Sequence, residues 1–397
     1  MRVRSVETKP SPRAEGWCRL EAVVEYDDAR TETEAYWLDV PGEHASALIT
    51  TGDPWLVLLA PLAATLGRPL RVDVPVHDDL LAGVREVIDI WTTWFPHLHC
   101  VSIEAPITGE SVAADNRGLG SFFSGGVDSF FTALRHRPAL DALVFVWGFD
   151  IALSNTTAWH TALAANERVA RELRVDLVPV VTNLRETRFA RTNWTRLSHG
   201  AALAGVAQAL GGMFQTMLIP SSASYRDLRP WGSHPETDVR FTSRRVRVVH
   251  DGAEWRRAEK TQTLADSELP LRHLRVCYHS DNGTNCGRCK RCYRTMLALE
   301  AVGALGRCVA FQRGALDLER AERLYCDDEP DVKQFGFVRE LAVRQGRPEI
   351  ARVIDRSLHR SRRMVPLVKT LRWLRRRPLF WRWAPSWEDR LLRRWVV

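Results

Sequence analysis

The chain has 397 residues, of which 45% are hydrophobic and 26% are charged. This ordinary balance excludes a disordered or collagen-like chain and is sufficient for a buried core in two or three domains. No stretch reaches the ~18 apolar residues that a membrane-spanning helix needs, and the charged N-terminus lacks the apolar segment of a signal peptide, so we expect a cytoplasmic protein without a transmembrane segment.

Residues 1–115 are expected to form a small N-terminal α+β domain. Its apolar residues alternate in two short stretches, as in strands, and then recur twice with helical periodicity. The predicted strands and helices are residues 19–26, 35–40, 55–66 and 77–95. A polar run at residues 113–118 predicts a linker to the next domain.

Residues 116–310 change to an alternation of apolar, strand-like runs and helical stretches. The predicted strands are residues 119–123, 143–149, 177–181, 217–220 and 246–250. The predicted helices between them are residues 128–136, 158–173 and 194–210. This alternation favours an α/β fold with a doubly wound parallel sheet and helices on both faces. In such sheets ligands bind at the carboxyl ends of the strands.

Residues 311–397 are expected to be a basic helical region, with helices at 332–345 and 349–356 separated by a Gly-Arg-Pro turn. The net charge of +8 arises here, because residues 352–397 carry 14 Lys and Arg against three Asp and Glu. Such an excess attracts nucleic acid or an anionic membrane surface, and a solvated helical face is the alternative. Residues 373–395, rich in Trp and Arg, receive no predicted fold.

The most informative motif is Ser124-Gly125-Gly126-Val127-Asp128-Ser129, which lies between a predicted strand and a predicted helix. Two glycines let the backbone turn sharply and approach a ligand. Their N–H groups and the positive end of the following helix favour an anion, and the two serines add hydroxyl donors. Asp128 would repel a phosphate unless a cation lies between them, which indicates Mg²⁺. The motif is therefore a candidate phosphate loop, although it lacks the lysine of the GxxxxGK[ST] loop.

This hexapeptide after the first strand of an α/β region resembles the signature of the PP-loop ATP pyrophosphatases. The resemblance implies a HUP-type fold, like that of the adenine nucleotide alpha-hydrolases, and a reaction that cleaves ATP between the α and β phosphates. It also implies that Ser124, Gly125, Gly126, Val127, Asp128 and Ser129 bind ATP, with Asp128 and Ser129 acting in catalysis.

A second motif is a cluster of four of the eight cysteines, Cys277-x8-Cys286-x2-Cys289-x2-Cys292. Four thiolates at such spacing can enclose one tetrahedral zinc ion, and a closed four-sulfur shell is structural rather than catalytic. An iron–sulfur cluster is the alternative, because three cysteines at two-residue spacing also suit one. The other four cysteines, at positions 18, 100, 308 and 326, are scattered in apolar surroundings and are interpreted as packing residues.

The cysteine motif downstream of the phosphate loop resembles the zinc knuckle of 7-cyano-7-deazaguanine synthase, an enzyme of queuosine biosynthesis. The resemblance covers roughly residues 118–300 and implies that Lys260, on a helix shortly before the cysteines, lies near the ATP phosphates; an exposed helix charge is the alternative. The first cysteine gap is one residue longer than in the synthase, and the N- and C-terminal regions have no counterpart there. The resemblance is therefore stronger evidence for the adenylation reaction than for the identity of the substrate.

Two further candidates follow the third predicted strand of the α/β region. Thr182 and Asn183 lie at its carboxyl end, where adenosine is expected to bind; the alternative is that Asn183 caps a turn. His199, in a helix of small residues, is either close to the nucleotide or a core histidine.

We therefore expect an ATP-dependent, AMP- and pyrophosphate-forming ligase that activates a carboxylate or amide for attack by ammonia or another amine. The expected cofactors are Mg²⁺ and Zn²⁺, and the expected partner is a small molecule, such as a 7-deazapurine, or a macromolecule that it modifies. One alternative is a tRNA thiolase that holds RNA with its basic C-terminal tail. Another is a non-catalytic or partner-modifying component of a multi-protein system, for example in phage defence. A homo-oligomer is left open.

Overall fold

The structure is a computed structural model that describes residues 1–27, 32–109, 118–312, 314–326 and 328–375. The chain forms two compact units. The first comprises Met1–Ser124 and Asp128–Glu254, and the second comprises Gly125–Val127 and Trp255–Val397. The first unit is built on a sheet, whereas the second is helical in its described part. The predicted domain boundaries at residues 115 and 310 stay a prediction.

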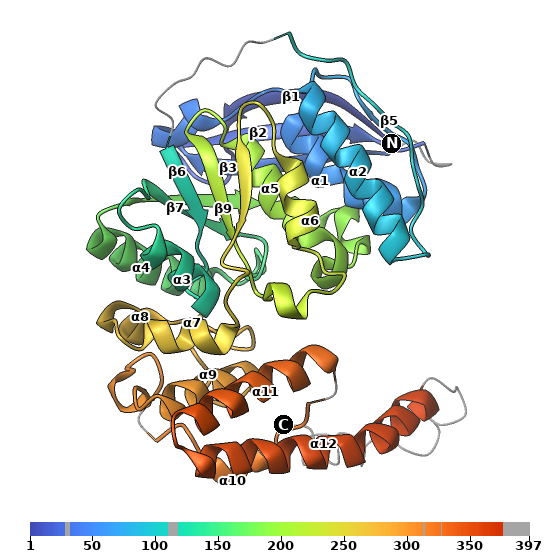
Figure 1. Cartoon of the computed structure of the whole chain (residues 1–397). Coiled ribbons are helices and arrows are strands. Elements are labelled where there is room, and N and C mark those ends of the chain that lie inside the picture. The colour runs from blue at the N-terminus through green and yellow to red at the C-terminus, as the bar shows by residue number, and fades with distance from the viewer. Residues whose placement is uncertain (28–31, 110–117, 313, 327, 376–397) are drawn as a thin grey trace. The chain divides into compact units, whose positions relative to one another are not determined.

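The first unit contains a ten-stranded sheet in the order β10-β9-β6-β7-β8-β3-β2-β1-β4-β5 (Figure 1). The strands are β1 (Arg2–Pro10), β2 (Trp17–Glu25), β3 (Thr33–Pro41), β4 (Leu70–Val72), β5 (Ile103–Glu104), β6 (Gly118–Phe122), β7 (Ala142–Trp147), β8 (Asp176–Thr182), β9 (Phe214–Pro220) and β10 (Arg247–Asp251).

Five neighbouring strands, β10, β9, β6, β7 and β8, are parallel to one another. They overlap the five predicted strands, and the expected α/β class is confirmed. The chain starts this part of the sheet at β6, moves outward through β7 and β8, and then returns to the other side of β6 for β9 and β10. An open sheet with this reversal is compatible with a doubly wound fold.

The N-terminal strands extend the same sheet with antiparallel pairs. β3 pairs with β8 through Leu38 and Thr182, and β2 then pairs with both β3 and β1. The sheet is therefore mostly parallel but mixed, rather than purely parallel as predicted. The local sequence pattern could not reveal the β3–β8 pair, because its two strands are far apart along the chain.

Helices cover both faces of this sheet (Figure 1). The longer ones are α1 (Asp53–Leu66), α2 (Asp78–Trp94), α3 (Val127–Arg135), α4 (Thr156–Leu173) and α5 (His199–Ala209). Short helical turns are η1 (Gly42–Ala47), η2 (Leu184–Glu186), η3 (Arg188–Arg191), η4 (Trp194–Ser198), η5 (Tyr225–Asp227), α6 (Pro235–Asp238) and η6 (Val239–Phe241).

Alternating strand residues face two separate apolar clusters, which explains the near-continuous apolar runs of β7 and β8. Phe145 and Trp147 pack against α4. Val144 and Val146 belong to the larger cluster that includes α1 and α5. The two helices α1 and α5 approach each other closely, because a Cβ atom on Gly205 would lie 2.4 Å from Cγ of Leu58.

The predicted helix at residues 194–210 is divided in the structure. A wide π-helical turn, Trp194–Ser198, precedes the regular helix α5. Asn193 caps that turn, because its side chain accepts a hydrogen bond from the N–H group of Arg196 at 3.0 Å. The sequence pattern predicted the helical character correctly but could not predict the wider first turn.

The described part of the second unit is helical, with α7 (Arg257–Leu264), α8 (Glu268–His273), α9 (Lys290–Ala301), η7 (Leu305–Arg307), α10 (Leu318–Arg323), α11 (Glu329–Arg344) and α12 (Pro348–Arg375). Here α9 contacts α7 and α11, while α12 packs against α10 and α11. The helices predicted at 332–345 and 349–356 are confirmed, although α12 is longer than expected. Most of the predicted linker and of the Trp- and Arg-rich stretch lies outside the described residues. Across the described ranges, no helix combines the length and apolar character needed to cross a bilayer.

Candidate functional site

The glycine loop connects the central strand β6 to helix α3, as its sequence predicted. Gly125 has a positive φ of 77°, a conformation that glycine adopts without steric cost. The Gly125 carbonyl oxygen accepts a hydrogen bond from the N–H group of Arg275 at 2.7 Å. Because α3 begins at Val127, the loop leads directly into a helix N-terminus, where N–H groups favour an anion.

The loop lies at a distinctive point of the sheet. It follows β6, which lies between β7 and β9, so it stands where the chain order of the strands reverses. In open α/β sheets this reversal opens a crevice at the carboxyl ends of the strands, and ligands bind there. Ser124 and Gly126 are half-buried, whereas Asp128 and Ser129 are 7% and 4% exposed.

A buried carboxylate that the sequence analysis did not single out holds α3 in place. Asp251, the last residue of β10, accepts a hydrogen bond from the hydroxyl of Thr132 at 2.7 Å and pairs with Nε2 of His136 at 2.8 Å. Both partners lie on or directly after α3. The only sequence signal was a polar residue at the end of an apolar strand. Asp251 is thus a positioning residue for the helix that follows the glycine loop.

The structure gives Thr182 and Asn183 a role in joining strands. The Thr182 hydroxyl donates to the carbonyl of Trp37 at 2.8 Å. The Asn183 side chain accepts from the N–H group of Trp37 at 3.0 Å and donates to the carbonyl of Ala35 at 2.8 Å. These bonds fasten the end of β8 to β3. An additional contact with adenosine stays a prediction.

Lys260 lies on α7 of the helical unit and is only 1% exposed. The alternative interpretation, an exposed helix charge, is therefore wrong. Lysine is rarely buried to this degree. The expected position of its ammonium group near ATP phosphates stays a prediction.

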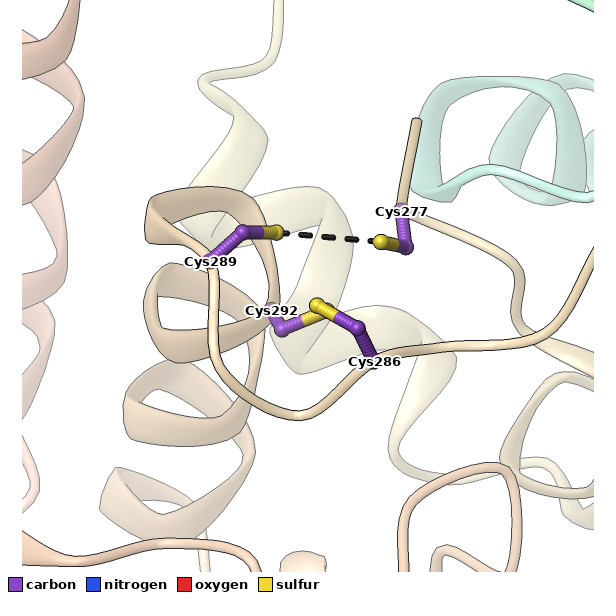
Figure 2. Close-up of side chains that lie close together, drawn as sticks. All are labelled: Cys277, Cys286, Cys289 and Cys292. Carbon is purple, nitrogen blue, oxygen red and sulfur yellow. Dashed lines mark hydrogen bonds between the residues drawn. The ribbon is translucent and has the colours of Figure 1, made fainter. Parts of the chain in front are cut away.

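The four cysteines of the second motif are brought together (Figure 2). Their sulfur atoms all lie within 4.8 Å of one another. The Sγ atoms of Cys277 and Cys289 are 3.9 Å apart, and those of Cys286 and Cys292 are also 3.9 Å apart. Cys277 and Cys292 are buried, while the other two are half-buried. The cluster can hold a metal ion.

Local structure explains why the sulfurs converge. Cys289 is the N-cap of α9 and Cys292 lies in its first turn. Gly287 has a positive φ of 65°, which turns the chain between Cys286 and Cys289. The side chain of Asn285 accepts from the N–H group of Val276 at 2.9 Å and donates to the carbonyls of Leu274 and Ala310 at 2.7 and 3.0 Å. Asn285 thus fixes the backbone before Cys277 and before Cys286.

The shared environment separates the pKa values of the thiols. Hydrogen bonding, first of all with the Cys292 thiol, lowers the pKa of Cys289 to about 4. The pKa of Cys292 is raised, mainly by its hydrogen bond to Cys289 and then by burial. The pKa of Cys277 is raised chiefly by burial. A bound cation would favour the thiolate form of all of them, since a coordinating thiol is deprotonated.

The structure therefore brings together the glycine loop, α3 and Asp251 on the one hand, and the four cysteines on the other. Two backbone N–H groups donate to the cysteine sulfurs: that of His279 to Sγ of Cys277, and that of Arg288 to Sγ of Cys286, both at 3.4 Å.

Each donor lies two positions after a cysteine, so it stabilises negative charge on that sulfur. Such N–H···S bonds suit thiolates that bind a metal. Comparison of the chain with family models, with curated proteins and with solved structures gives no match in any of the three.

Proposed function

We propose that the protein is an ATP-dependent adenylating enzyme of the PP-loop type, which cleaves ATP to AMP and pyrophosphate. The observation that carries the proposal is the place of the Ser124–Ser129 loop. A glycine turn that leads into a helix N-terminus stands at the reversal point of a parallel sheet. Loop, helix and sheet position each favour an anionic ligand at the same point.

The order of the parallel strands supports a HUP-type interpretation of this unit. Counted along the chain from β6, the first strand is central, the second and third lie to one side, and the fourth and fifth lie to the other. Doubly wound sheets that bind nucleotides have their first five strands in this order. The pyrophosphate end of ATP would lie on the loop, and its adenosine would extend along the carboxyl ends of the neighbouring strands.

Within this proposal the residues of the loop have distinct tasks. The N–H groups of the glycine turn and the first turn of α3 would bind phosphate oxygens, and Ser124 and Ser129 would orient them. Asp128 would hold Mg²⁺, which neutralises charge on the phosphates when bound. A carboxylate or amide oxygen of the acceptor attacks the α phosphate, pyrophosphate leaves, and an amine then displaces AMP. Catalysis is by positioning and charge neutralisation, without a covalent enzyme intermediate.

The cysteine cluster supports a structural zinc ion. Four sulfurs that lie 2.3 Å from one tetrahedral zinc ion are about 3.8 Å apart, and two of the observed Sγ–Sγ distances are 3.9 Å. In a four-iron cluster each cysteine binds a different iron ion, so its sulfurs are further apart than sulfurs that share one ion. The observed distances therefore favour a single ion, held in a closed shell.

The thiols outside the cluster disfavour the thiolation alternative, which needs a reactive sulfur. Burial raises the pKa of Cys308 to about 11 and also raises the pKa of Cys18. Cys326 is buried as well, whereas Cys100 is exposed, so the interpretation of Cys100 as a packing residue is wrong. A thiol with a raised pKa is a poor nucleophile at neutral pH.

The proposal is tested by product analysis with ATP, Mg²⁺ and a panel of carboxylates and amines. AMP with pyrophosphate is the expected pair, whereas ADP with phosphate would contradict the reaction type. Asp128→Ala should abolish pyrophosphate release. The matched control is Asp176→Ala, because Asp176 is exposed and begins β8, at the amino end of the strand. Turnover retained by Asp128→Ala and equal to that of the control would remove the mechanism.

A further inference from the structure

A stack of rings and guanidinium groups stands at the carboxyl ends of β7 and β8. The Arg13 guanidinium carbon lies over two tryptophan rings, 5.0 Å from the centroid of Trp147 and 5.7 Å from that of Trp37. Trp147 is the last residue of β7, and the backbone of Trp37 is bonded to Thr182 and Asn183 at the end of β8. All five residues belong to the sheet unit.

The two tryptophan rings, which form the walls of the stack, are held in place by other residues. Trp147 stacks on Trp159 of α4 with a centroid distance of 5.0 Å and an interplanar angle of 6°, and its Nε1 donates to the carbonyl of Ala152 at 3.0 Å. Trp37 has the guanidinium of Arg19 over its ring at 4.0 Å. Arg19 is buried and is held by Asp39 at 2.7 and 2.8 Å.

Arg13, which lies over both rings, is held much less firmly. Arg13 is exposed and lies in the β1–β2 loop, where residues 12–16 are all exposed. Its backbone N–H group donates to the Ser11 hydroxyl at 3.2 Å. Within the described ranges, the contacts of its guanidinium are the cation–π contacts with these two rings. Trp147 is 6% exposed and Trp37 is half-buried, whereas Arg13 itself is exposed. Cation–π contacts of an exposed side chain contribute about 0.5–1 kcal/mol each, so the guanidinium can leave at small cost.

We propose that Trp37 and Trp147 form a stacking site for a planar nucleobase of purine size, and that Arg13 fills this site in the free protein. A guanidinium group is planar and stacks on aromatic faces, so it occupies the kind of space that a nucleobase would take. The carboxyl ends of parallel strands are where such a ligand is expected. Rigid walls around a removable side chain make a preorganised site.

The choice of a purine rests on the proposed function, which brings a nucleotide to this edge of the sheet. The ring could be the adenine of ATP or the base of a second substrate, and the chemistry of stacking is the same for both. After displacement, the Arg13 guanidinium stays on the exposed loop with its donors available to an anionic group of the ligand.

The experiment measures binding of 2-aminopurine riboside, whose fluorescence is quenched on stacking, to the full-length protein. Trp37→Ala should weaken binding at least fivefold, because base–aromatic stacking of about 1–3 kcal/mol corresponds to roughly 5- to 150-fold. Trp37→Phe keeps a ring and should stay within about threefold of the wild type. Arg13→Ala should tighten binding by about two- to fivefold, since the competing side chain is gone.

Glu15→Ala, on the same exposed loop, is the matched control and should leave the affinity unchanged. Displacement of the probe by AMP assigns the site to ATP, and displacement by guanosine assigns it to a second base. Equal binding by Trp37→Ala and Trp37→Phe, or no tightening in Arg13→Ala, would overturn the inference. Formation of AMP and pyrophosphate by a protein that fails these tests would refute the stacking site alone, while stacking without AMP formation would refute the proposed reaction alone.

Discussion

Replacing one cysteine of the four-sulfur cluster tests the metal site directly. Cys292→Ala removes a sulfur that is fully buried in the first turn of α9. If the four sulfurs share one zinc ion, three ligands remain and the closed shell is opened. We expect the variant to lose the metal and the helical unit to lose stability.

The size of the effect follows from the geometry. Two of the sulfur–sulfur distances, at 3.9 Å, are within about 0.1 Å of the separation around tetrahedral zinc, and all four sulfurs lie within 4.8 Å of one another. Structural zinc sites contribute about 10–16 kcal/mol of binding free energy at pH 7. With free zinc at a hundred times the dissociation constant, the linked stabilisation is about 2.7 kcal/mol. For a unit of this size that corresponds to roughly 5–11 °C in melting temperature.

The assay combines elemental analysis with thermal unfolding of the purified full-length protein. The wild type should carry one zinc ion per chain, and chelation should lower its melting temperature by the amount given above. Cys308→Ala is the matched control, because Cys308 is equally buried in the helical unit but lies outside the cluster. The control should keep its zinc, whereas Cys292→Ala should not.

Three results would refute this reasoning. Detection of iron with acid-labile sulfide would show that the four cysteines bind an iron–sulfur cluster and not zinc. A full equivalent of zinc in Cys292→Ala would show that the fourth sulfur is not a ligand. An unchanged melting temperature after complete removal of the metal would show that the ion does not stabilise the fold.

Three further predictions concern the sheet unit. Asp128→Asn, which keeps the size of the side chain but removes its charge, should reduce pyrophosphate release by roughly a hundredfold or more with an unchanged melting temperature. A fall in the melting temperature together with the loss of pyrophosphate release would point to misfolding. Gly205→Ala places a Cβ atom 2.4 Å from Cγ of Leu58 and should lower the free energy of unfolding by about 1–3 kcal/mol in urea, whereas Gly336→Ala, with no atom within 4 Å of its Cβ, should not lower it. Burial lowers the pKa of His199 below its ordinary value of 6.5, so the unfolded chain binds more protons and stability should fall as the pH drops through 6.5, by at most about 1.4 kcal/mol per pH unit; a His199→Gln variant with the same pH dependence as the wild type would contradict this.

Much of the α/β architecture was predictable because its signals are local. Strands β6 to β10 are short apolar runs, and the helices between them show periodic apolar faces. The glycine loop was found for the same reason, since Ser124–Ser129 is contiguous. The four cysteines span only residues 277–292, so their spacing alone predicted that they would meet.

The features that escaped prediction depend on partners far away along the chain. β1 is mostly exposed, with only Val3 buried, so it lacks the alternation of a half-buried strand. Helix α9 was not predicted because its apolar pattern is interrupted by the polar residues Arg294 and Thr295, which are nevertheless buried. The hydrogen bonds of Thr182 and Asn183 reach residues 35 and 37, and nothing in their own surroundings indicates this.

Functional side chains with distant partners were missed in the same way. Asp251 was not singled out because its partners, Thr132 and His136, are 119 and 115 residues away. Arg13 and the two tryptophans lie in three separate elements, so no motif connects them. The burial of Lys260 could not be inferred either, because a single lysine near a helix start is most often exposed.

The pairing of β3 with β8 has a consequence for how the chain folds during synthesis. The hydroxyl of Thr182 bonds to the carbonyl of Trp37, 145 residues earlier, and the apolar helix α1 is buried with α5. The first strands and helices therefore leave the ribosome before the elements that cover them have been made, and long-range contacts of this kind form slowly. A nascent chain that ends before β8 carries an open strand edge and an apolar helix, which are the features that chaperones bind and that cause aggregation.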